Sequence, residues 1–216
     1  MSTTVSKQFS TFNTLARTGE YTSGGNSFKW QSTSNASSQN DVYSSLNYTD
    51  GSNNTQPAPI SVTPAVTTNW LVCKNLDTNI PTSATIEGIK IYIDRYNGFT
   101  GDGVVTIKDD GIYLTKNGTD TVGNNKSTSA TWASTDTDTY VTFGGVSDLW
   151  GTTWTASEVN SDNFGVMIGP NIEYDGLTGE TGNSARIDHV YVEITYTDAG
   201  GGRRRAVFVA KNNPDI

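Results

Sequence analysis

Two segments of the chain alternate regularly between apolar and polar side chains, and this alternation limits the possible folds more than any other feature. The first segment spans residues 85–96 and the second spans residues 187–196. Their apolar positions are Ile89, Ile91 and Ile93 in the first segment and Val190, Val192, Ile194 and Tyr196 in the second. A period of two residues is that of a β-strand with one buried face. We therefore predict two long strands whose apolar faces share one hydrophobic core.

Shorter apolar segments surround these two strands and are separated by glycine-rich turn signals. They cover residues 69–74, 104–107, 112–115, 140–143 and 164–168. No amphipathic helix of ordinary length is present, although Thr155 and Glu158 have the spacing of a capping box and predict about one helical turn. The sequence therefore predicts an all-β protein: an antiparallel β-sandwich, jelly-roll-like, with extended N- and C-terminal arms.

The composition changes along the chain and suggests three parts. Residues 1–64 are expected to form an N-terminal arm and a Ser/Thr/Asn-rich loop region. Within them, the spacing of Phe9, Phe12 and Ala16 permits a short helix, and residues 42–48 permit one short strand. Residues 65–198 are expected to form the sandwich. Residues 199–216 are expected to form a basic C-terminal tail, tethered by three consecutive glycines.

The net charge of −8 and the pI near 4.5 make nucleic acid an unfavourable main partner, because an acidic surface repels phosphates. Cys73 is the only cysteine, so no disulfide can form within the chain, and its apolar neighbours predict a buried thiol. No apolar leader and no apolar run of membrane-spanning length occurs. We therefore expect a protein made in the cytoplasm, with no membrane partner.

No set of residues matches a known catalytic motif. His189 is the only histidine, and simple alternation places Asp188 on the opposite face of its strand, so a structural histidine is favoured over a general base. Asp109 and Asp110, with Asp102, could supply Ca²⁺ ligands or a glycosidase pair. Adjacent aspartates beside glycines are, however, typical turn formers. We expect no enzymatic activity, no catalytic residue, no bound metal and no cofactor.

The tryptophans allow two interpretations. Trp132, Trp150 and Trp154, together with nearby tyrosines, could form a platform on which sugars stack, which would make the protein a glycan-binding module. Alternatively they anchor loops to the core, since aromatic side chains supply much of the burial available to so polar a chain. The sequence favours anchors.

Several segments between residues 80 and 197 occur in an order that resembles a known domain family. They include Ile80-Pro81, residues 84–93, Gly144 to Thr155, residues 160–166 and residues 187–197. This order resembles a β-sandwich domain family that recurs in bacteriophage virion structural proteins and in some bacterial surface proteins. The segment Asp148-Leu-Trp-Gly is its most distinctive part. The resemblance implies a virion role, as a capsid decoration (cement) protein or a tail accessory, and implies no catalytic residues.

The C-terminal tail lies outside that resemblance and suggests a partner-binding segment. After the glycines come Arg203, Arg204 and Arg205, followed by an apolar run that contains Val207, Phe208 and Val209. Such a run can add a strand to an exposed sheet edge. We expect it to dock on a neighbouring subunit within a homo-oligomer or on another virion protein, either the major capsid protein or a tail protein. A tail or fibre protein, and a carbohydrate-binding adhesion module, are the alternatives to capsid decoration.

Overall fold

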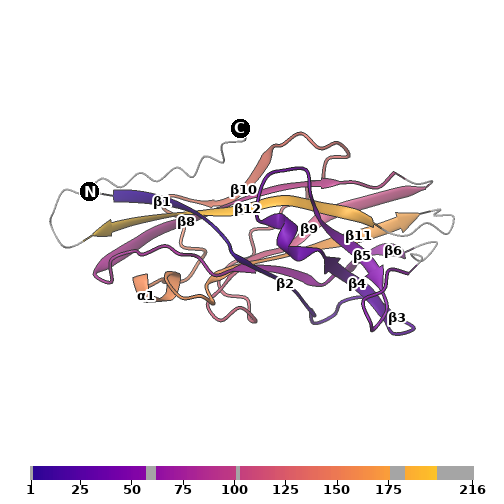
Figure 1. Ribbon diagram of the computed structural model, residues 1–216, viewed down its shortest axis with the longest axis horizontal. Helices are drawn as coiled ribbons and strands as arrows, with labels where there is room; N and C mark the ends of the chain where they lie inside the picture. The colour runs from indigo at the N-terminus through magenta and orange to yellow at the C-terminus, as the bar shows by residue number, and fades with distance from the viewer. Residues whose placement is uncertain (1, 57–61, 101–102, 176–182, 199–216) are drawn as a thin grey trace.

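The computed structural model describes residues 2–56, 62–100, 103–175 and 183–198. These residues form two antiparallel β-sheets packed around one hydrophobic core, with the long strands along the long axis of the molecule (Figure 1). The predicted all-β sandwich is therefore confirmed. Within the same ranges, no helix is long and apolar enough to span a bilayer.

Sheet A is organised around its longest strand. Its strands are, in spatial order, β10 (Tyr140–Gly145), β8 (Ala84–Asn97), β12 (Asn183–Asp198), β5 (Ser44–Thr49), β4 (Asn26–Gln31) and β3 (Thr22–Ser23), with β1 (Ser2–Gln8) also on β12. One edge of β12 pairs with β8 from Ala185 to Asp198. The other edge pairs with β5 near its start and with β1 near its end.

Sheet B repeats this plan with a different set of strands. They are β2 (Thr11–Leu15), β7 (Trp70–Lys74), β11 (Gly165–Asp175), β6 (Val62–Thr67) and β9 (Val104–Thr115). One edge of β11 pairs with β9, and the other pairs with β7 and then β6. Each sheet thus has one long strand that holds two short strands in succession on one edge.

The two alternating segments bury the faces that the sequence predicts. On these two faces, the side chains without exposed surface are those of Ile89, Ile91 and Ile93 of β8 and of Val190, Val192 and Ile194 of β12. Tyr196 is partly buried and packs against them. They meet apolar side chains of β7, β9 and β11 in a single cluster. Cys73 of β7 belongs to this cluster and is fully buried, as predicted.

Strand β9 is continuous, whereas the sequence predicts two short strands on either side of a turn. A β-bulge at Asp110 explains the difference, because Asp109 pairs with Pro170 and Gly111 pairs with Gly169. One extra residue reverses the alternation. Ile107 points inward before the bulge and Ile112 points inward after it, so the apolar pattern loses its phase within one strand.

The N-terminal region is part of the sandwich, so the prediction of an arm and a loop is wrong for residues 2–49. Strands β1 to β5 lie within these residues. Phe12 lies in β2 opposite Cys73, which also excludes the predicted helix, and Phe9 is 2% exposed. Strand pairing overrides the weak local signal of these polar segments. The strand predicted near residues 42–48 is confirmed as β5.

Two short helical segments complete the described structure. The 3₁₀ helix η1 (Thr33–Ala36) lies between β4 and β5. Helix α1 (Ala156–Val159) has the predicted capping box, because Glu158 N donates to Thr155 Oγ1 and Thr155 N donates to Glu158.

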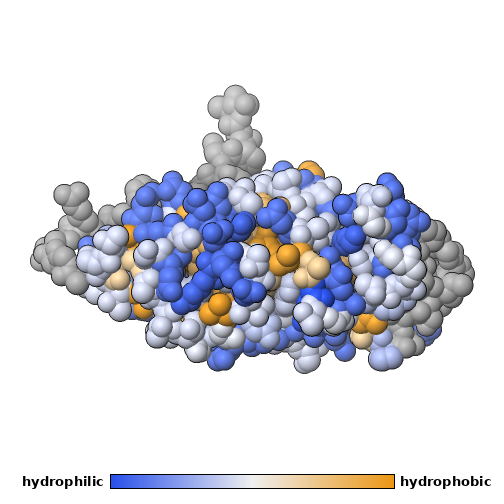
Figure 2. All heavy atoms as spheres, turned by 90° about the horizontal axis from the view of Figure 1, so that it is seen from below, coloured by the Kyte–Doolittle hydropathy of each residue, from blue (hydrophilic) through white to orange (hydrophobic). Residues whose placement is uncertain are grey.

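Figure 2 shows a largely hydrophilic face on which apolar residues form small, separate groups.

Candidate functional site

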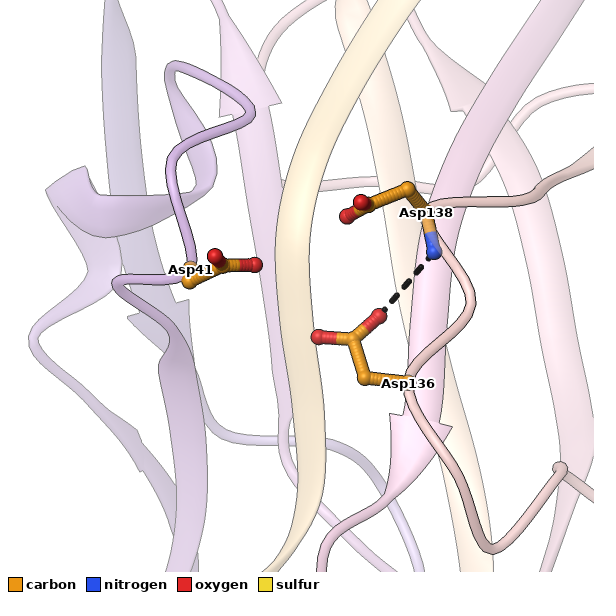
Figure 3. A group of neighbouring side chains, drawn as sticks. All are labelled: Asp41, Asp136 and Asp138. Carbon is orange, nitrogen blue, oxygen red and sulfur yellow. Dashed lines mark hydrogen bonds between the residues drawn. The ribbon is translucent and has the colours of Figure 1, made fainter.

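Five aspartates from four segments gather at one place on sheet A. We call Asp41, Asp94, Asp136, Asp138 and Asp188 the aspartate cluster. Oxygens of Asp94, Asp138 and Asp188 lie within 4.8 Å of one another, as do oxygens of Asp41, Asp136 and Asp138. Figure 3 shows the second group, in which Asp41 faces Asp136 and Asp138 from a different loop. Asp138 belongs to both groups and therefore joins them.

The fold brings these residues together through strand pairing and one bulge. Asp94 of β8 lies opposite His189 of β12, and Asp188 is the additional residue of a β-bulge between Ile187 and His189. Bulges re-aim side chains and recur beside functional sites. This bulge brings the carboxylate of Asp188 next to that of Asp94, on the side where His189 lies. The prediction that Asp188 and His189 occupy opposite faces is therefore wrong.

Two loops supply the other three aspartates. Asp136 and Asp138 precede β10, whose first residue pairs with Asp94. Asp41 lies in the connection between η1 and β5. Asp41 and Asp138 have φ values of 59° and 49°, a left-handed conformation that aspartate tolerates better than most residues.

Neutral donors surround the cluster. Asn40 N donates to Asp188 Oδ2 at 3.0 Å, and Gln39 Nε2 donates to Asp94 Oδ2 at 3.0 Å. Tyr43 donates a short hydrogen bond to Asp136. None of the ion pairs in the described part of the chain includes a member of the cluster. Among the described residues, the negative charges of the cluster are therefore compensated by neutral hydrogen-bond donors and not by a positively charged side chain in an ion pair.

Burial and the close approach of these carboxylates raise the pKa values of two of them. Burial, together with the negative charges of Asp136, Asp188 and Asp138, raises the pKa of Asp94 to about 6. Burial also raises the pKa of Asp188 to about 6, with Asp41 and Asp136 adding to the rise and backbone hydrogen bonds opposing it. Both carboxyl groups thus hold protons more strongly than ordinary aspartates, because ionising them adds charge to an already negative site.

His189 does not offset this charge. Burial lowers the pKa of His189 to about 4, so the imidazole is neutral at pH 7. Its Nδ1 lies 2.7 Å from Tyr140 Oη, which also donates to Gln39 Oε1 at 2.8 Å. These contacts give His189 a structural place in the network that holds the cluster.

A row of tyrosines extends from the cluster across the outer face of sheet A. Tyr140 of β10, Tyr92 of β8 and Tyr191 of β12 are all partly exposed. The rings of Tyr92 and Tyr191 are stacked with centroids 4.3 Å apart, and Tyr140 meets both edge-on. Tyr92 Oη donates to Glu193 at 2.6 Å. In this tyrosine row, Tyr92 and Tyr191 cover each other's faces, and Lys90 Nζ lies 4.5 Å from the centroid of the Tyr92 ring.

The three tryptophans considered as a sugar platform are core anchors. Trp132, Trp150 and Trp154 are 3%, 0% and 6% exposed. Trp150 Nε1 donates to the carbonyl oxygen of Ile89 at 2.9 Å, and Trp154 Nε1 donates to that of Leu149 at 3.1 Å. The anchor interpretation is confirmed, and these rings are not available for stacking.

Asp109 and Asp110, the residues considered for Ca²⁺, are each paired with a different arginine. Asp109 is buried and lies 2.8 Å from Arg95 Nη2. Asp110 lies on the other side of the sheet, 2.9 Å from Arg17 Nη1. Strand alternation places the two carboxylates on opposite faces of the sheet, so the adjacent aspartates do not share a site. Asp102 lies outside the described residues.

The predicted partner-binding residues of the tail also lie outside the described residues. These are Arg203, Arg204, Arg205, Val207, Phe208 and Val209. Their docking stays a prediction.

Comparison of the chain with family models, curated proteins and solved structures finds no match. The resemblance to phage virion proteins therefore stays a prediction as well.

The aspartate cluster could not be predicted from sequence spacing. Asp136 and Asp138 are close in the chain, but Asp94 and Asp188 lie 94 positions apart and meet only because β8 pairs with β12. The bulge at Asp188 leaves no local signal, since strict alternation would turn that side chain away. The one available hint was the pair of aspartates in the loop before β10.

Proposed function

We propose that the protein is a structural component of a bacteriophage particle, most specifically a capsid decoration protein, that works through protein–protein contacts. The observation that carries the proposal is an open sheet edge. In the described structure, β10 pairs only with β8, on one side. An edge strand of this kind offers free backbone groups to an added strand.

The C-terminal segment has the properties of such a strand. Residues 206–210 form an apolar run behind three arginines, while the chain as a whole carries a charge of −8. We infer that this segment, residues 203–210, docks on a sheet edge of a neighbouring subunit or of a shell protein. On a neighbouring copy of this acidic chain, the arginines would then lie near carboxylates.

Truncation after Gly202 tests this proposal. We expect the truncated protein to keep the sandwich fold, judged by circular dichroism, and to lose co-sedimentation with particles that lack the native protein. A chain ending at Asn212 keeps the arginines and the apolar run and is the matched control, which should bind as the full chain does. Full-length binding should also weaken as salt rises, because exposed ion pairs are screened.

The outcomes separate the candidate functions. Equal binding by the truncated and full-length proteins would contradict docking by the tail. Copy number in purified particles distinguishes hundreds of decoration subunits from the tens or fewer of a tail protein. The tyrosine row makes glycan binding the second candidate, because it gathers partly exposed aromatic rings and hydrogen-bonding side chains on one face of sheet A. Binding to a glycan array, without binding to particles, would support that role instead.

A further inference from the structure

The carboxylate of Asp188 is nearly fully buried and incompletely bonded. Asp188 is 1% exposed, and within the described structure its Oδ1 has no hydrogen-bond partner. Buried polar atoms are normally satisfied, and an orphaned carboxylate oxygen is costly. The carboxylate to which this oxygen belongs lies within reach of those of Asp94 and Asp138. A further group that accepts oxygen ligands would complete the site.

The spacing of the oxygens matches one kind of group. Two oxygens bound to the same Ca²⁺ at about 2.4 Å each can be at most about 4.8 Å apart. The oxygens of Asp94, Asp138 and Asp188 satisfy this limit for every pair. We propose that the aspartate cluster is a Ca²⁺ site in which Asp94, Asp138 and Asp188 are the protein ligands. Asp41 and Asp136 lie next to it and add negative charge.

The chemistry of the surroundings favours Ca²⁺ over the alternatives. The nearby arginine, Arg186, donates to Tyr96 Oη at 2.9 Å and forms no ion pair with the cluster. His189 is engaged by Tyr140. Mg²⁺ requires near-ideal octahedral geometry and keeps most of its water, whereas Ca²⁺ accepts several carboxylates in irregular arrangements. The carboxylates of this cluster come from a strand, a bulge and a loop, an irregular arrangement of the kind that Ca²⁺ accepts.

Bound Ca²⁺ would connect parts of the chain that are distant in sequence. Asp94 and Asp188 lie on neighbouring strands of sheet A, and Asp138 lies in the loop that leads into the edge strand β10. The ion would fix this loop to the sheet and neutralise the repulsion between the ligands. The site is independent of the proposed virion role, so either can fail without the other.

Calcium titration of the metal-stripped, full-length protein tests the site. We expect Tm to rise by about 5–10 °C when free Ca²⁺ is about one hundred times the Kd, and EDTA to reverse the rise. Tb³⁺ is a second probe, because a Tb³⁺ ion at this site would be close to Tyr43 and Tyr140. Excitation of tyrosine should then produce Tb³⁺ emission that Ca²⁺ removes. Absence of both signals would overturn the proposal.

Three variants locate the binding. Asp188→Asn and Asp138→Asn should each weaken Ca²⁺ affinity at least tenfold in isothermal titration calorimetry. Asp138 is exposed, so its variant keeps the test decisive if the buried Asp188→Asn fails to fold. Asp162→Asn, at an exposed aspartate outside the cluster, is the matched control and should bind as the unaltered protein does. Unchanged affinity in Asp138→Asn would also overturn the assignment.

Discussion

Asp109 shows how much one residue can depend on its neighbours in this core. Its carboxylate accepts hydrogen bonds from Arg95 at 2.8 Å, from Thr128 at 3.1 Å and from Trp132 Nε1 at 3.0 Å. The guanidinium of Arg95 also lies 4.6 Å above the Trp132 ring. Burial lowers the pKa of Arg95, and the charge of Asp109 opposes that change. Each side chain thus provides the main electrostatic partner of the other inside the protein.

A double-mutant cycle measures this dependence. Asp109→Asn should lower the free energy of unfolding by about 3–5 kcal/mol, because it leaves the Arg95 charge buried without a partner. Adding Arg95→Met removes that charge, while the amide oxygen introduced by Asp109→Asn can still accept from Trp132, so the double variant should be more stable than Asp109→Asn alone. Urea denaturation of the four proteins gives the coupling energy. Additive effects would mean that the two side chains do not compensate each other.

The sequence could not assign this role to Asp109. An aspartate next to Asp110 and Gly111 has the local appearance of a turn, whereas β9 continues past Asp109 and places it on the inward face with Ile107. Asp188 was unpredictable for a different reason, because it is itself the additional residue of the bulge in β12. Apolar residues with an uninterrupted period, such as Ile91, were predictable because their environment follows from alternation alone.

At the scale of elements, local signals were sufficient where they involved neighbours in the chain. Strands β8 and β12 follow from their alternation, and α1 follows from its capping box. Strands β1, β2 and β4 were missed because they are rich in polar residues and become strands by pairing with β12, β7 and β5. Strand propensity depends strongly on such tertiary partners.

Helix α1 provides a prediction at this scale. Thr155→Ala removes the side-chain acceptor for Glu158 N and should lower the free energy of unfolding by about 1 kcal/mol. Thermal or urea denaturation measures the loss. Thr152→Ala, at a nearby threonine outside the capping box, is the control and should change stability less. Equal losses in the two variants would show that the cap contributes nothing specific.

At the scale of the whole molecule, β1 is an integral strand of the sandwich. It pairs with β12 over seven residues and buries Val5 to 6% exposure. Deletion of residues 2–8 should therefore lower Tm by roughly 5–10 °C or more, since the burial of Val5 alone contributes about 1.5–3 kcal/mol. Truncation after Gly202 serves as the contrast and should leave Tm nearly unchanged. A Tm unaffected by the N-terminal deletion would restore the idea of a peripheral arm.

The pairing of β1 with β12 also sets the order of events during synthesis. Ser2 lies opposite Thr197 and Gln8 lies opposite Tyr191, so β1 has no partner until β12 leaves the ribosome. At about 5–20 residues per second, the nascent chain carries this strand unpaired for on the order of ten to forty seconds. Its sequence suits that delay, because Val5 is the single apolar residue among serines, threonines, a lysine and a glutamine. A strand so polar can stay in water without recruiting other nascent chains.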